Sequence, residues 1–132
     1  MMFMSPELKT TVECGNCSRL CTGETLCKTI FTNQGKSEGF VAVTPNFPAR
    51  VVPINLAQYG GKLLAKNGSF LASSGDVSVA ASVDCCSCAA CCGGLGMVRQ
   101  SVTGSGTAFL AAGGTVLNKV LQPNEASMQC SL

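Results

Sequence analysis

The sequence predicts an all-β domain, and three observations lead to that prediction. Its apolar residues fall in short runs in which apolar and polar residues alternate, as they do in half-buried strands. Gly, Pro, Asn and Ser separate these runs at close intervals, and no long helical periodicity is visible. Many short strands with frequent turns are typical of sandwiches and barrels. We therefore expect repeated antiparallel β-units that form a sandwich or barrel.

The expected strands follow one another along the whole chain. In order, they are the apolar start at 1–4, then 8–13, 26–32, 40–43, 51–56, 62–65, 69–72, 76–80, 97–102, 107–112 and 115–121, with a strand-like end at 127–132. Asn67-Gly68 predicts a two-residue hairpin because both positions tolerate positive φ. Gly113-Gly114 predicts a second tight turn. Gly104-Ser105-Gly106 lacks the Lys and helix of a phosphate-binding loop, so a hairpin is expected there too.

Length and charge predict a single domain that associates with copies of itself. The 132 residues suffice for one core, and charged residues make up 12%, about half the usual share. Because such a surface is poorly solvated, we expect a homo-oligomer, as a ring, stack or filament.

The net charge of +2 is spread thinly, so no nucleic acid is expected. No apolar run reaches the roughly 18 residues of a transmembrane segment, and a peripheral membrane association stays open. The start does not resemble a secretory signal.

Ten cysteines stand out, and eight of them form two clusters with a common spacing. Cys85, Cys88 and Cys92 each lie 71 residues after Cys14, Cys17 and Cys21 respectively, and similar residues follow both clusters. This relation predicts one domain over 1–132 made of two internal repeats, at about 8–72 and 76–130.

Three interpretations of the cysteines stay open. Cys14, Cys17, Cys21, Cys85, Cys88, Cys91 and Cys92 are the candidate metal ligands, since two converging C-x-x-C pairs would give zinc four thiolates. However, about 70 residues separate the pairs, far more than in ordinary zinc sites. Disulfides are equally compatible and would indicate an extracellular protein. The third interpretation is reduced cysteine as a small apolar residue. The cofactor therefore stays unknown.

Catalysis is not expected, because the chain contains no histidine. A reactive thiol or serine normally relies on a neighbouring base, and histidine is the commonest one. The seven acidic residues all occur singly, which offers no carboxylate pair. Glu24 and Glu125 lie in expected turns, where we interpret each as an acceptor of backbone N–H groups. We predict no catalytic and no cofactor-binding residues.

Short motifs in a consistent order resemble those of a known family. They occupy 22–26, 45–48, 51–54, 68–74, 93–96, 104–110 and 121–125. Over nearly the whole chain they resemble the altered-inheritance-of-mitochondria family, a β-domain of bacteria and fungal mitochondria. The resemblance implies an all-β fold similar to a double-stranded β-helix or to the tryptophan-RNA-binding attenuation protein. It implies no catalytic residues, no established cofactor, and a part in inner-membrane organisation for mitochondrial members.

Together these inferences predict a non-enzymatic protein that self-associates or acts as a scaffold for a larger, membrane-associated complex. The alternatives are a cysteine-rich zinc module and, by fold analogy alone, an RNA-binding ring. The resemblance implies a cytoplasmic or mitochondrial location. The family's segments before these strands are usually rich in glycine, whereas this chain has cysteines there.

Overall fold

The chain forms an all-β structure, as predicted. The computed structural model describes residues 2–14, 27–83 and 98–125, and within these ranges it has ten strands and one short 3-10 helix. They are β1 (Met2–Met4), β2 (Leu8–Cys14), β3 (Cys27–Asn33), β4 (Val41–Val43), β5 (Arg50–Asn55), the 3-10 helix η2 (Leu56–Tyr59), β6 (Lys62–Lys66), β7 (Phe70–Ser74), β8 (Val77–Val83), β9 (Val98–Gly104) and β10 (Thr107–Ala112).

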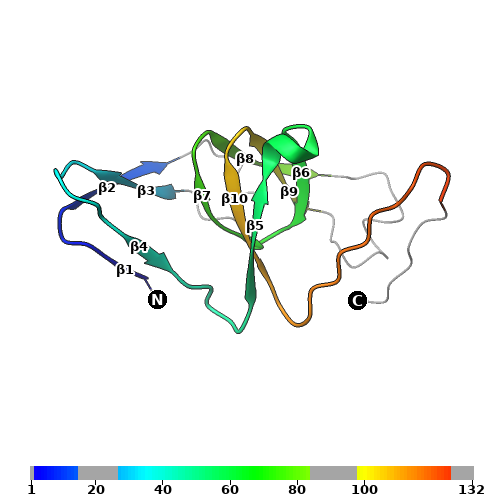
Figure 1. The fold of residues 1–132 in the computed structure, drawn as a ribbon, viewed down its shortest axis with the longest axis horizontal. Helices are drawn as coiled ribbons and strands as arrows, with labels where there is room; N and C mark the ends of the chain where they lie inside the picture. Colours follow the sequence, from blue (N-terminus) through cyan, green and yellow to red (C-terminus); the bar gives the residue numbers. More distant parts are fainter. Residues whose placement is uncertain (1, 15–26, 84–97, 126–132) are drawn as a thin grey trace.

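These strands form four antiparallel sheets. Two sheets have three strands, in the orders β5-β10-β7 and β6-β9-β8, and two have two strands, β1-β4 and β2-β3. In Figure 1 the two-stranded sheets lie to one side of the three-stranded ones. From β5 to β8, successive strands alternate between the two larger sheets.

Two of the predicted hairpins are wrong, because the chain changes sheets at each of the two turns. β6 and β7 flank Asn67-Gly68, and β9 and β10 flank Ser105-Gly106, but the members of each pair belong to different sheets. Gly68 does adopt the expected positive φ of 79°. The turn residue therefore bends the chain as predicted, but it does not determine which strand becomes the partner. Both turns instead carry the chain from one sheet to the other.

The core lies between the two larger sheets and is small. Leu56, Val102 and Ala108 are fully buried, and they come from η2, β9 and β10. The partly buried apolar residues packed around them are Leu63, Phe70, Val77 and Val79. One polar side chain also joins the sheets: Gln100 of β9 is 5% exposed, and its Oε1 accepts the backbone N–H of Phe70 in β7 at 3.0 Å.

The expected strand at 51–56 ends one residue early because a helical turn begins. The Asn55 side chain accepts the backbone N–H of Ala57 at 3.1 Å and so caps η2. Gly60, at a φ of 69°, ends the turn, and the N–H of Gly61 bonds to the Leu56 carbonyl at 2.9 Å. The capped turn directs Leu56 into the core.

The predicted strand at 115–121 does not form. Residues 115–122 have no regular secondary structure, and no strand in the described part of the chain pairs with them. The alternating pattern is present, but a β-strand requires a neighbour for its backbone N–H and C=O groups. The predicted strand at 127–132 lies outside the described residues.

One order of strand pairing occurs twice. β1 pairs with β4 and β2 with β3, just as β7 pairs with β10 and β8 with β9. β3 and β9 also begin 71 residues apart, at Cys27 and Val98. The second set has in addition β5 beside β10 and β6 beside β9. The repeat boundaries at 8–72 and 76–130, and their union in one domain, stay a prediction.

Candidate functional site

In the sequence, the two cysteine clusters lie between the strands of two corresponding pairs, β2–β3 and β8–β9. Of the candidate ligands, Cys14 ends β2 and lies opposite Cys27, the first residue of β3, in the antiparallel register. The other candidates, Cys17, Cys21, Cys85, Cys88, Cys91 and Cys92, lie outside the described residues. One cluster belongs to the connection from β2 to β3, and the other to the connection from β8 to β9. Metal, disulfide and reduced cysteine all stay predictions.

The described ranges contain no cluster of metal-ligating side chains. Among residues 2–14, 27–83 and 98–125, no three Cys, Asp or Glu residues come close enough together to hold an ion. The same ranges contain no helix that is long and apolar enough to cross a bilayer.

Three carboxylates on the described surface make structural contacts. Glu7 accepts the Ser37 hydroxyl at 3.0 Å, which ties the turn before β2 to the connection after β3. Glu13 pairs with Lys28 across β2 and β3 at 3.1 Å. The third carboxylate is that of Glu125. Each is at the surface and touches a Ser, a Lys or a backbone amide, as expected of groups that fix turns and strand pairs.

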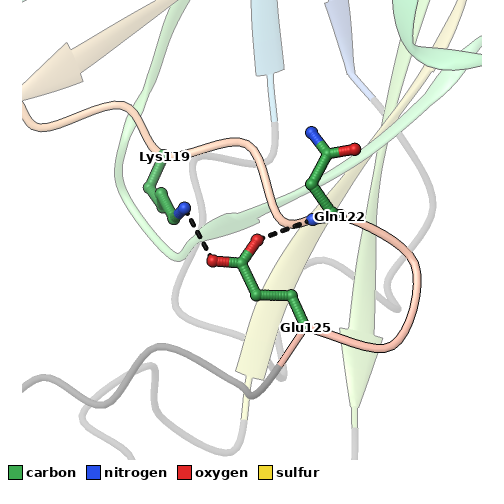
Figure 2. Close-up of polar contacts among 3 residues, drawn as sticks. All are labelled: Lys119, Gln122 and Glu125. Carbon is green, nitrogen blue, oxygen red and sulfur yellow. Dashed lines mark hydrogen bonds and ion pairs between the residues drawn. The ribbon is translucent and has the colours of Figure 1, made fainter.

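Figure 2 shows the turn that Glu125 stabilises. One carboxylate oxygen accepts the backbone N–H of Gln122 at 2.8 Å, and the other lies 2.7 Å from the Lys119 Nζ. The N–H of Glu125 bonds to the Gln122 carbonyl, and Asn124 adopts a positive φ of 65°. The prediction that Glu125 accepts a backbone N–H in a turn is confirmed. Glu24 lies outside the described residues.

These contacts make the turn sensitive to acid. The N–H of Gln122, followed by the ammonium of Lys119, lowers the pKa of Glu125 below its ordinary value of 4.5. Because the folded pKa is below the unfolded one, the stabilisation is present above pH 4.5 and is lost as the pH falls through the folded pKa. We expect NMR of the Glu125 carboxyl carbon to show a midpoint below 4.5, and Lys119→Met to raise it. A midpoint at or above 4.5 in the unmodified protein would contradict the contacts in Figure 2.

Gly104-Ser105-Gly106 is not a phosphate-binding loop. The N–H groups of Ser105 and Gly106 both bond to the Asp76 carbonyl at 3.0 Å, and the Gly104 N–H bonds to the Gly61 carbonyl. These donors hold β8, β9 and β10 together at one end, so they are not available to an anion. The hairpin expected at these residues is replaced by a crossing between sheets.

Apolar side chains are exposed at the two ends of the described structure. On the smaller sheets and their connection, the exposed ones are Phe3, Met4, Val12, Phe40 and Val41. On the C-terminal segment, defined as residues 115–121, they are Val116, Leu117, Val120 and Leu121. Leu117 is the most exposed at 74%. Large contiguous apolar patches mark sites of contact with another molecule, and Phe47, Val51, Tyr59 and Leu64 are exposed between these two ends as well.

Unfilled strand edges accompany these apolar residues. In the described part of the chain, β4 pairs only with β1, and β3 only with β2, so each has one edge without a neighbouring strand. An open edge offers a row of backbone donors and acceptors to another strand. Exposed strand edges were expected from the sequence, but the sequence does not show that they belong to β3 and β4.

Taken together, the strands and their four antiparallel sheets define the chain as an all-β protein. The family model for mitochondrial biogenesis AIM24 matches residues 1–129. The chain therefore belongs to the AIM24 family, as its motifs predicted. No curated protein matches the sequence.

Proposed function

We propose that this chain is a non-enzymatic structural domain that associates with copies of itself and serves as a scaffold in a larger assembly. The observation that carries the proposal is the exposure of apolar side chains at both ends of the described structure, together with the edges of β3 and β4 that have no neighbouring strand among the described residues. In addition, the small core buries only a few side chains completely, so the described structure gains little from burial within one copy.

The composition supports the same proposal. A 12% share of charged residues gives a weakly solvated surface, which favours contact between copies. The absence of histidine from the sequence removes the commonest general acid–base, and three described carboxylates are occupied in structural contacts. These features support a protein that acts through surface contacts and not through catalysis.

Sedimentation equilibrium on the full chain tests this function. With reductant present to exclude disulfide cross-links, we expect a mass at least twice that of the monomer at micromolar concentration. The association should persist at high salt, because apolar contacts and backbone hydrogen bonds depend little on ionic strength. A single monomeric species across the concentration range would reject the proposal.

A further inference from the structure

β5 shows how an outer strand is accommodated in this fold. It pairs with β10 from Arg50↔Ala112 to Asn55↔Thr107, and η2 follows it directly. β4 holds the place in the first set of strand pairs that β10 holds in the second, since β4 pairs with β1 as β10 pairs with β7. The edge of β4 away from β1 therefore corresponds to the edge that β5 fills on β10.

The C-terminal segment has the features of β5. Val116-Leu117 matches Val51-Val52, and Leu121 matches Leu56 at the same interval. Each segment then enters a turn that contains a residue in the left-handed conformation, Gly60 at 69° in one and Asn124 at 65° in the other. The likeness extends to position in the chain, because β5 follows β4 and the C-terminal segment follows β10.

The C-terminal segment and the outer edge of β4 do not meet within one copy. In Figure 1, β1 and β4 lie at one end of the molecule, whereas the segment after β10 extends at the opposite end. Both ends expose apolar side chains, as shown by Phe40 at 60% and Leu117 at 74%. Among the described residues, an extended segment without a partner strand and a strand edge without a neighbour thus lie at opposite ends of the molecule.

We propose that residues 115–121 of one copy pair antiparallel with the outer edge of β4 in a second copy, as β5 pairs with β10. This inference rests on the self-association proposed above and specifies its interface. Because every copy both supplies a segment and receives one, the contact is head-to-tail. Such contacts close into a ring or extend as a filament, according to the angle between copies.

Proline substitutions at adjacent positions test the pairing. Pro53 lies within β5 opposite Phe109, so the missing N–H at that position is tolerated, and the neighbouring residues supply the hydrogen bonds to β10. Its counterpart in the C-terminal segment is Asn118, and the counterpart of Val52 is Leu117. Leu117→Pro should remove a hydrogen bond to β4, whereas Asn118→Pro is the matched control.

Sedimentation velocity over a dilution series gives the readout. We expect Leu117→Pro to raise the dissociation constant by about tenfold or more, which corresponds to one backbone hydrogen bond and its packing. Asn118→Pro should stay within about threefold of the unmodified protein. Equal affinities for all three proteins, with the unmodified protein still oligomeric, would overturn this interface and leave self-association standing. A monomeric unmodified protein would reject the proposed function itself.

A mixing experiment tests whether the Leu117→Pro variant is folded. Its β4 is unchanged, so a fluorescently labelled sample at trace concentration should join assemblies of the unmodified protein. Joining, together with loss of self-association, is the expected result. If the labelled variant sediments alone although its far-ultraviolet circular dichroism is unchanged, β4 is not the receiving edge and the inference is wrong.

Discussion

Gly104→Ala is expected to lower the free energy of unfolding by about 3 kcal/mol or more. Gly104 adopts a φ of +135°, and a β-carbon there would overlap the backbone carbonyl of Asp76. That carbonyl also accepts the N–H groups of Ser105 and Gly106, so it cannot move away without breaking both bonds. The clash involves backbone on both sides, and a change of side-chain rotamer cannot relieve it.

Gly114→Ala is the matched control for this substitution. Gly114 has a positive φ of 76°, but a β-carbon there meets no atom within 4 Å. Only the conformational penalty applies, so we expect a loss of about 1 kcal/mol. Urea denaturation at one fixed protein concentration would measure both variants, because self-association makes apparent stability depend on concentration. Equal losses would show that the contact with Asp76 does not form.

Leu56→Ala should destabilise the protein by about 2–5 kcal/mol. Leu56 is fully buried and contributes to the cluster with Val102 and Ala108 between the two larger sheets. With so few fully buried side chains, little else can move in to fill the cavity. A loss of this size is a large fraction of the stability of a small domain.

Leu64→Ala provides the comparison, because Leu64 lies on the neighbouring strand β6 with 51% of its surface exposed. Its truncation removes the same atoms without opening a cavity, and we expect a change within about 1 kcal/mol. If the two leucine variants lose similar stability in urea denaturation, Leu56 does not belong to the buried core.

The sequence was a good guide to strands and a poor guide to their partners. Alternation and turn residues located the strands, including Thr107–Ala112 with its observed bounds. They could not show that β6 and β7 belong to different sheets, because pairing depends on which apolar faces meet in the core. The end of β5 was missed for a local reason, since Asn55 caps a helical turn that strand propensity does not reveal.

For the candidate site too, the sequence predicts the character of the residues but not their arrangement. The chemical character of the cysteines, the missing histidine and the turn role of Glu125 follow from residue types and spacing. The open edge of β4 could not be predicted, because an unfilled edge is a property of the whole sheet. Low charge favours contact between copies, which stays a prediction, and composition cannot say which surfaces would meet.

Hydrogen–deuterium exchange by mass spectrometry tests the interface most directly. Peptides covering 40–44 and 113–122 would be followed above and below the concentration at which the protein dissociates. We predict that both are protected in the assembly and that both lose protection after dilution, since each supplies backbone hydrogen bonds to the other. Peptide 113–122 should then exchange rapidly, whereas the amides of 40–44 that bond to β1 or Ser5 within one copy should stay protected. Rapid exchange of both peptides in an intact assembly would contradict the account.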